Sequence, residues 1–425
     1  MQEEREYTEA TEQENNHVIL VGVDFGTYDA ERSMNELWAL AESDELTPVA
    51  SVLQKREKAV SATFLGKGKL EEIKQLIETQ EVGLCVFDAE LSGIQIRNIE
   101  KELDCEIMDR TMLILDIFNK RAVTNEGKLQ TELARLQYRL PRLVGLGVAL
   151  SRQAGGGGGG GGARRGAGES RLEYDRRHIR RRIDYLKKKL EESETHKKET
   201  RRKREKNGIP IVALVGYTNV GKSSLLNAIT GADAGVENKL FATLDPTARS
   251  GVLPSGQQVI FIDTVGFVSR LPHHLVEAFK TTLEEAKYAD ILLCVCDVAD
   301  EEAEEQLNIT SEVLKGLEAN GEVITVYNKA DMLSEIFKTD KGVFVSAKTG
   351  IGIEALLEKV DALLADRVQA VSMLLPYNKI GLAAPLKQAG AVQSEEYGED
   401  GVLLLATVQR KDMAKYEQYI INKGE

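Results

Sequence analysis

The stretch that most constrains the fold lies near the middle of the chain, where IVALVGYTNVGKSSLLNAIT spans residues 211–230. An apolar run is followed by a turn with two glycines and then by a helical pattern. The turn, Gly216 to Ser223, fits the phosphate-binding pattern G-x-x-x-x-G-K-[ST]. In that pattern backbone amides wrap the phosphates, the lysine reaches the β- and γ-phosphates, and the hydroxyl ligates Mg²⁺. The sequence therefore predicts an α/β domain in which Lys222 binds phosphate and Ser223 binds magnesium.

Three further motifs follow, each at the end of an apolar, strand-like run. These are DTVG at 263–266, NKAD at 328–331 and SAK at 346–348. This is the order that a GTPase requires. Each motif is weak singly, but four in order leave little room for coincidence.

The residue types of these motifs match the parts of a guanine nucleotide. Asp263 is expected to support Mg²⁺ through an intervening group, and the Gly266 amide to sense the γ-phosphate. The Asp331 carboxylate only accepts hydrogen bonds, so it matches the two donors on the guanine edge, whereas adenine presents an acceptor there. The Ala347 amide is expected to meet guanine O6. The predicted reaction is hydrolysis of GTP to GDP and phosphate.

Two positions indicate how hydrolysis is controlled. Phe267 follows Gly266, where many GTPases carry the glutamine that orients the attacking water. A phenyl ring cannot do this, so we expect slow hydrolysis alone and stimulation by an external surface. Asn219 in the phosphate loop is typical of GTPases that recruit K⁺, which makes K⁺ a further expected cofactor. A threonine must also close on the γ-phosphate through Mg²⁺, and the stretch NKLFATLDPTAR offers Thr243 and Thr247.

Upstream, residues 17–110 alternate apolar runs with helical patterns, which is typical of a small parallel sheet. The LGKGK segment at 65–69 is a weak hint of a second nucleotide site, since turns use glycine routinely. Leucines and isoleucines then repeat at heptad-like spacing on both sides of eight glycines, Gly155–Gly162. Two such seams bury each other best as an antiparallel helical hairpin with the glycines at its tip. Ser170 with Glu173 is a plausible capping box for the second helix, and Pro141 should kink or interrupt the first.

Charge is distributed unevenly along the chain. Residues 164–206 hold 18 Lys or Arg against nine Asp or Glu, while the whole chain has a net charge of −13. A basic arm on an acidic body suggests a polyanionic partner. A solvated helix with paired charges explains the same pattern equally well.

Composition sets further bounds on the 425-residue chain. Its hydrophobic content of 42% is ample for several domains, and no apolar run is long enough to span a membrane. The acidic N-terminal residues 1–16 lack the apolar stretch of a signal peptide. The four cysteines fit no zinc pattern and are expected to be thiols in the cores of a cytoplasmic protein.

The chain resembles the HflX family of ribosome-associated GTPases. The resemblance covers roughly residues 17–370 and rests on GYTNVGKSSLLNAIT, LFATLDPTAR, DTVGFV with LPHHLVEAF, and YNKAD, together with RTMLILDIF, EGKLQTELARLQYRLPRL and the glycine-rich tip. It favours Thr243 over Thr247 as the second magnesium ligand. It implies Lys222, Thr243 and Gly266 as catalytic residues, while His273 and His274 are expected to cap a helix.

The complete predicted nucleotide site combines the motifs with the stretch around Thr243. Its residues are Gly216, Tyr217, Thr218, Asn219, Val220, Gly221, Lys222, Ser223, Phe241, Ala242, Thr243, Leu244, Asp245, Asp263, Thr264, Val265, Gly266, Asn328, Lys329, Ala330, Asp331, Ser346, Ala347 and Lys348.

The resemblance implies binding to the large ribosomal subunit, with ribosomal RNA contacted through the hairpin tip, and the splitting or rescue of stalled ribosomes under stress. Glycines at the tip would let the backbone press on packed RNA while Arg152, Arg164 and Arg165 neutralise phosphate. A monomer in the cytoplasm is expected, with a possible pool on ribosomes or a membrane surface. Two alternatives stay open: a GTPase acting on another RNA, in tRNA modification or ribosome assembly, and a signalling GTPase with a coiled-coil docking arm.

The predicted architecture is α/β and multidomain. A P-loop GTPase domain with a mostly parallel sheet (208–366) is preceded by a disordered acidic N-terminus (1–16), a small parallel α/β domain (17–127) and a helical hairpin with a basic linker (128–207). A small C-terminal α/β domain of βαβ type (367–425) follows.

Overall fold

The computed structural model describes residues 16–143, 163–207, 209–232, 240–270, 275, 285–333, 342–365, 368–388, 391–409 and 412–423. The chain divides into two units. The first contains Met1–Glu192, Lys239–Ala242 and Ser269–Phe279, and the second contains Ser193–Asn238, Thr243–Val268 and Lys280–Glu425. Two short segments of the first unit thus come from the middle of the sequence that forms the second.

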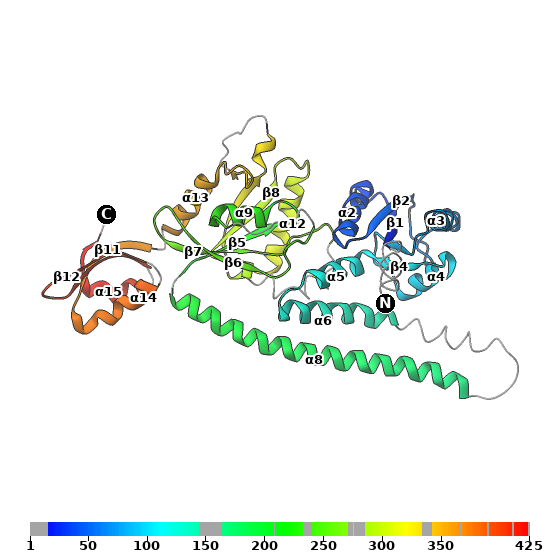
Figure 1. Ribbon diagram of the computed structural model, residues 1–425, viewed down its shortest axis with the longest axis horizontal. Helices are drawn as coiled ribbons and strands as arrows, with labels where there is room; N and C mark the ends of the chain where they lie inside the picture. Colours follow the sequence, from blue (N-terminus) through cyan, green and yellow to red (C-terminus); the bar gives the residue numbers. More distant parts are fainter. Residues whose placement is uncertain are drawn as a thin grey trace, which may run out of the picture. The chain divides into compact units, whose positions relative to one another are not determined.

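The first unit is built on a four-stranded parallel sheet with the order β2-β1-β3-β4. Helices α2 and α5 pack together on one face, and α3 and α4 on the other (Figure 1). Because both faces are covered, the central strand β1 is buried almost throughout. The elements are β1 (His17–Asp24), α2 (Ala30–Ser43), β2 (Thr47–Lys55), α3 (Lys67–Gln80), β3 (Leu84–Phe87), α4 (Gly93–Leu103), β4 (Glu106–Asp109) and α5 (Arg110–Arg121).

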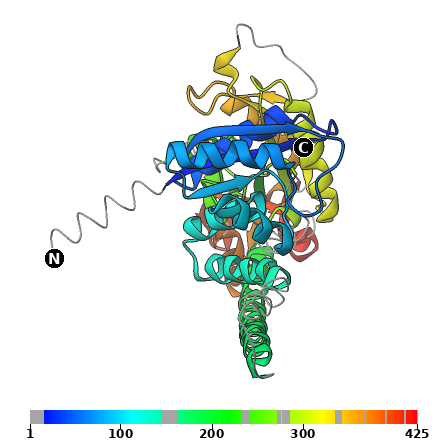
Figure 2. The same cartoon turned by 90° about the vertical axis from the view of Figure 1, so that its right-hand side faces the viewer.

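Two further helices, α6 (Asn125–Arg142) and α8 (Ala163–Asn207), lie side by side and antiparallel (Figure 1, Figure 2). Arg182 of α8 donates through Nε and Nη2 to the Glu132 carboxylate of α6, at 2.7 and 2.8 Å. On α8, Ile183 and Leu186 are buried, as the heptad spacing predicts. The glycine run at the expected tip lies outside the described residues.

Two details of these helices bear on the sequence predictions. Pro141 lies in the last turn of α6, which ends one residue later, in keeping with the expected interruption. The capping-box prediction at Ser170 is wrong, because α8 begins seven residues earlier at Ala163. A serine inside a helix cannot cap its N-terminus.

The second unit contains a six-stranded sheet with the order β10-β9-β8-β5-β7-β6. All its neighbouring strands are parallel except β6 and β7. The strand that leads into the phosphate loop, β5, is buried along its whole length. The elements are β5 (Ile211–Gly216), α9 (Lys222–Thr230), β6 (Thr247–Val252), β7 (Gln258–Asp263), β8 (Ile291–Asp297), α12 (Ala303–Gly316), β9 (Glu322–Asn328), η2 (Ala330–Met332), β10 (Val343–Phe344) and α13 (Ile353–Ala365).

The C-terminal sheet has the order β12-β13-β11-β14 and its strands are antiparallel. β11 and β12 both run antiparallel to β13, which lies between them, so they are parallel to each other, and a helix connects them. This is a split βαβ unit, in keeping with the predicted βαβ type. A tight turn, in which the Gly398 amide donates to Gly401 O at 2.9 Å, joins β12 to β13. The elements are β11 (Val368–Leu375), η3 (Tyr377–Leu382), α14 (Ala383–Gln388), β12 (Val392–Tyr397), β13 (Val402–Gln409), α15 (Met413–Tyr416), η5 (Glu417–Tyr419) and β14 (Ile420–Lys423).

Within the described part of the chain, no helix combines the length and the apolar character that a membrane crossing requires. All four cysteines are free thiols, and three of them are buried.

Candidate functional site

The loop between β5 and α9 depends on its two glycines. Gly216 has a φ of +145°, and a Cβ atom there would lie 2.2 Å from Val295 O. Gly221 has a φ of +88°, and its Cβ would lie 2.4 Å from Asn328 Nδ2. At Gly216 both the backbone conformation and the neighbouring backbone exclude a side chain, whereas at Gly221 the backbone conformation disfavours one and a Cβ would displace the Asn328 amide. Asn219, which also has a positive φ of 60°, lies on the exposed side of the loop.

Lys222 is 7% exposed and folds back over this loop. Its Nζ donates to the carbonyls of Gly216 at 3.1 Å and Tyr217 at 2.6 Å. Burial lowers the pKa of Lys222 to about 8, although the nearby Asp263 carboxylate opposes that shift. The cation is thus held at the loop with little solvent around it, which strengthens its attraction for an anion.

Three side chains converge at the start of α9. The Ser223 hydroxyl donates to Asp263 Oδ2 at 2.6 Å and lies 2.9 Å from Thr243 Oγ1. Asp263 is 1% exposed, burial raises its pKa, and among the described residues its Oδ1 has no hydrogen-bond partner. The structure therefore brings the two predicted magnesium ligands and the predicted supporting carboxylate together. Thr247, the alternative threonine, begins β6 instead.

The segment after Asp263 continues along the loop. A Cβ atom on Gly266 would lie 2.9 Å from Lys222 Nζ, so its backbone lies close to the lysine head group. Phe267 pairs with Tyr217 in an isolated bridge, and its side chain is 2% exposed. The Phe267 ring is therefore part of the core and cannot orient a water.

Residues of the third and fourth motifs are joined through Asn328. Its Nδ2 donates to Val220 O at 2.8 Å, and its Oδ1 accepts from the Ala347 amide at 3.1 Å. Asn328 thus links the phosphate loop to the SAK motif. The amide that the sequence predicts for guanine O6 is directed at this asparagine.

The Asp331 carboxylate is positioned by Ser346, whose hydroxyl donates to it at 2.6 Å. This hydrogen bond lowers the pKa of Asp331, so the group is ionised at neutral pH. Lys329 has a φ of 62° and pairs with Asp297, 2.6 Å from Nζ to Oδ2. An exposed carboxylate in this position can accept two donors from a planar ring.

The residues just before Thr243 belong to the first unit, whereas Thr243 belongs to the second. Leu240 and Phe241 belong to the first unit, where the Leu240 amide donates to Ser43 Oγ at 2.9 Å. The ring of Phe241 packs edge-on against Phe118, with 4.6 Å between centroids, and is 2% exposed. Its side chain is therefore covered by the first unit, which the sequence did not indicate.

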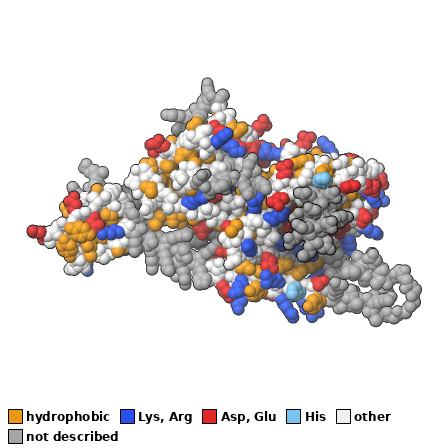
Figure 3. All heavy atoms as spheres, in the orientation of Figure 1, with side chains coloured by type: hydrophobic (Ala, Val, Ile, Leu, Met, Phe, Trp, Pro, Cys, Tyr) orange, Lys and Arg blue, Asp and Glu red, His pale blue; other side chains and the backbone are white. Residues whose placement is uncertain are grey.

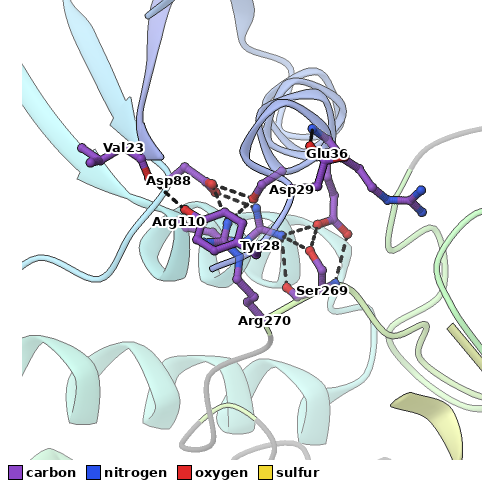
Figure 4. A network of polar contacts seen from close by, with 10 residues as sticks. Val23, Tyr28, Asp29, Glu36, Asp88, Arg110, Ser269 and Arg270 are labelled. Carbon is purple, nitrogen blue, oxygen red and sulfur yellow. Dashed lines mark hydrogen bonds and ion pairs between the residues drawn. The ribbon is translucent and has the colours of Figure 1, made fainter. Parts of the chain in front are cut away.

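The stretch after Val268 is also held by the first unit, in a polar network (Figure 4). Arg110, at the start of α5, donates to Glu36 at 2.6 Å and to Asp88 at 2.8 Å. It also donates to the carbonyl and hydroxyl oxygens of Ser269, at 3.2 and 3.3 Å. The Ser269 amide and hydroxyl in turn both donate to Glu36.

Arg270 completes this network. Its Nη2 donates to Asp88 Oδ2 at 2.5 Å and to Ser33 Oγ, and its guanidinium lies 4.2 Å above the Tyr28 ring. Arg270 adopts this pose with a φ of +51°. Burial alone would lower the pKa of Arg110, but the carboxylates of Glu36 and Asp88 raise it. The network fixes the residues that come three and four positions after Gly266.

The sequence did not single out this network. Its one local signal is the charged sequence DR at 109–110, placed between a strand and the apolar helix TMLILDIF. A charge at the start of a buried helix must find partners. In the LGKGK segment, which hinted at a second nucleotide site, Gly66 is the N-cap of α3. The prediction that His273 and His274 cap a helix concerns residues outside the described part of the chain.

On the described part of α8, exposed Lys and Arg side chains stand among acidic ones (Figure 3). Arg177, Arg180 and Arg181 are exposed beside Tyr174, whose side chain is 69% exposed. Aromatic and cationic side chains interleaved on one helix suit a polyanion with stacking bases.

Comparisons with known proteins agree with these motifs. Three family models match, described as GTP-binding GTPase N-terminal (residues 31–119), GTP-binding GTPase Middle Region (121–204) and 50S ribosome-binding GTPase (211–329). GTPase HflX of Caldanaerobacter subterraneus subsp. tengcongensis is 48% identical over 95% of this chain and 94% of its own length. GTPase HflX of Escherichia coli is 38% identical over 91% and 92%.

Among solved structures, one described as "crystal structure of SsGBP and GDP complex" is 25% identical, with a TM-score of 0.49, over 82% of this chain and 99% of that one. The two HflX proteins are 48% and 38% identical over more than nine tenths of this chain, and the chain therefore belongs to the HflX family and is a GTPase.

Proposed function

We propose that this GTPase binds the large ribosomal subunit and splits or rescues stalled ribosomes under stress. The observation that supports this most is the match of residues 211–329 to a model described as a 50S ribosome-binding GTPase. The exposed arginines and Tyr174 on α8 add a surface suited to RNA. We place the protein in the cytoplasm, as a monomer with a pool on ribosomes.

At the phosphates, Lys222 binds the β- and γ-oxygens of GTP and the amide of Gly266 contacts the γ-phosphate. Ser223 and Thr243 are the residues that would ligate Mg²⁺, with Asp263 acting through a metal-bound water. The site fits such an ion, because Asp263 Oδ1 is buried without a hydrogen-bond partner and the two hydroxyls are 2.9 Å apart. When bound, Mg²⁺ would neutralise charge on the phosphate oxygens.

At the base, the Asp331 carboxylate accepts from the two guanine donors, and Ser346 keeps it ionised and oriented. Asn328 holds the phosphate loop and the SAK motif at a fixed separation. The remaining predicted residues of the motifs line the nucleotide through backbone groups. In this arrangement the Asp331 side chain selects guanine, and the other residues hold the loops in position around the nucleotide.

Hydrolysis is slow in the free protein because Phe267 is buried and cannot position water. The ribosome supplies the missing group. Assistance by a residue in trans typically raises the rate by about 10³–10⁵-fold. K⁺ near Asn219 adds positive charge beside the phosphates.

At the ribosome, α8 and the segment that precedes it in the sequence contact the RNA. The glycine run at 155–162 allows close approach of the backbone, and Arg152, Arg164 and Arg165 neutralise phosphate.

The test is sedimentation of ribosomal subunits with the protein and a GTP analogue that is not hydrolysed. We expect co-migration with the large subunit that weakens steeply with salt. Deletion of residues 155–162 should leave GTP binding intact and abolish subunit splitting. A chain that binds GTP but never migrates with the large subunit would exclude the ribosomal function; binding that ignores salt would favour a protein partner.

A further inference from the structure

Two thiols of the first unit lie next to each other, and no role in GTP hydrolysis involves them. Cys85 is in β3 within the core, with no exposed surface. Cys105 is half-buried at the bend that leads into β4. Their Sγ atoms are 3.8 Å apart, close to van der Waals contact.

We propose that Cys85 and Cys105 form a reversible disulfide when the protein meets hydrogen peroxide. A disulfide needs the sulfur atoms at about 2.05 Å, so they must approach by roughly 1.8 Å. Cys105 can supply that movement. It follows Asp104, which ends α4 with a φ of 52°, and it precedes the ladder between β3 and β4 rather than pairing within it.

The two thiols differ in the way that a reacting and a resolving cysteine should. Cys105 is the accessible member, so peroxide reaches it first. Its contact with the Cys85 thiol lowers the pKa of Cys105, and the same contact together with burial raises the pKa of Cys85. The more accessible sulfur is therefore also the better nucleophile.

The chemistry closes with peroxide as the only co-reactant. The Cys105 thiolate attacks one peroxide oxygen, the O–O bond breaks, and a sulfenic acid and hydroxide form. Cys85 then loses its proton and attacks the Cys105 sulfur, so that the S–S bond forms as the S–O bond breaks. The departing hydroxides take up the two thiol protons. The sum is two thiols and one peroxide giving one disulfide and two waters.

The bond would join the strands that lead into the polar network. Asp88 follows β3 directly, and Arg110 follows β4 directly. A covalent link between these strands therefore lies three to five residues from the groups that hold Ser269 and Arg270.

The experiment uses the full chain exposed to hydrogen peroxide, then blocked by alkylation and digested with trypsin without reductant. The two cysteines fall in different tryptic peptides, Gln75–Arg97 and Glu102–Arg110. We expect the linked pair of peptides by mass spectrometry, and its loss after dithiothreitol. Cys294 and Cys296 serve as internal controls, since burial raises the pKa of each to about 12 and both should stay reduced.

Two variants distinguish the reacting thiol of Cys105 from the resolving thiol of Cys85. Cys85→Ala removes the resolving thiol, so Cys105 should accumulate as a sulfenic acid that dimedone traps. Cys105→Ala should leave Cys85 reduced, because Cys85 is buried. The proposal is overturned if wild-type Cys105 oxidises without the linked peptides appearing, or if neither Cys85 nor Cys105 reacts faster than Cys294.

Discussion

Asp88 and Arg270 form an ion pair, 2.5 Å from Oδ2 to Nη2, that joins the end of β3 to a residue four positions beyond Gly266. The same carboxylate also accepts from the buried Arg110. One side chain of the first unit thus balances two cations, of which one comes from the stretch that follows the DTVG motif.

Asp88→Asn should destabilise the first unit by about 3–5 kcal/mol, because it leaves buried Arg110 with a single carboxylate, Glu36. Hydrogen exchange of peptides from β1 to β4 measures the effect. Glu71→Gln, an exposed change on α3, is the control and should have little effect. Equal hydrogen exchange in the two variants would show that Asp88 does not stabilise the first unit to this extent.

Lys222→Met should stabilise the nucleotide-free protein while abolishing GTP binding. The pKa of Lys222 is about 8 rather than the ordinary 10.5, so the unfolded chain holds its proton more tightly than the folded chain. The charged lysine therefore opposes folding by about 3 kcal/mol at neutral pH, a cost that fades as pH rises from 8 to 10.5.

Thermal unfolding at pH 7 and pH 10 measures this, with exposed Lys315→Met as the control. Part of the gain is offset because two loop carbonyls lose their donor. The expectation fails if the Lys222 variant melts below the wild type at pH 7 in the absence of nucleotide.

Asp331→Asn should change the base preference. Guanine offers two donors to the carboxylate, whereas xanthine offers one donor and one acceptor, which suits an amide. We expect GTP affinity to fall by about 10–150-fold, the value of one or more charged hydrogen bonds, and xanthosine triphosphate to bind better than it does to wild type. Titration of both nucleotides on both proteins measures this. Unchanged GTP affinity would remove Asp331 from base recognition.

Gly216→Ala should damage the second unit far more than Gly231→Ala. Both glycines have a positive φ, +145° and +65°, but only at Gly216 does a Cβ meet backbone, 2.2 Å from Val295 O. The conformational cost at Gly231 is about 1–2 kcal/mol, and overpacking at Gly216 adds about 1–3 kcal/mol. Denaturant unfolding of the two variants, followed by loss of GDP binding, compares their stabilities. Similar losses in the two variants would contradict the steric argument.

Potassium should accelerate GTP hydrolysis relative to sodium, since Asn219 lies at the loop position typical of GTPases that recruit K⁺. Phosphate release at matched ionic strength in the two salts measures the difference. Asn219→Ala should abolish it. Equal rates in wild type would exclude a cation role for Asn219.

The grouping of the motif residues could be predicted from sequence because its information is local. Each motif pairs a buried strand with a polar strand end, and parallel strands deliver those ends to one edge of the sheet. The convergence of Ser223, Thr243 and Asp263 follows from that rule. The magnesium and guanine roles that we propose rest on the donors and acceptors of the side chains.

The polar network could not be predicted, because its partners are far apart in the sequence. Asp88 and Arg270 are separated by 182 residues, and no periodicity relates them. The buried side of α6 was also not predicted, for another reason. Its buried residues include Gln130, Thr131 and Ala134, which leave no apolar pattern beside the leucines of the same helix.

The C-terminal sheet shows a third limit. The βαβ type could be predicted there, but two parallel strands joined by a helix can be neighbours or can enclose a third strand, and here β13 lies between β11 and β12. The turn at 398–401, GEDG, is short enough to have indicated the hairpin that pairs β12 with β13.

The three partners of Arg110 limit which substitutions related proteins can carry at these positions. Loss of Glu36 or Asp88 alone leaves the buried Arg110 with one carboxylate instead of two, and loss of the Ser269 hydroxyl removes one of its acceptors. A change at one of these sites is therefore best tolerated together with a compensating change at another. In an alignment of relatives the four positions should vary jointly or remain fixed, although they are scattered across most of the length of the gene.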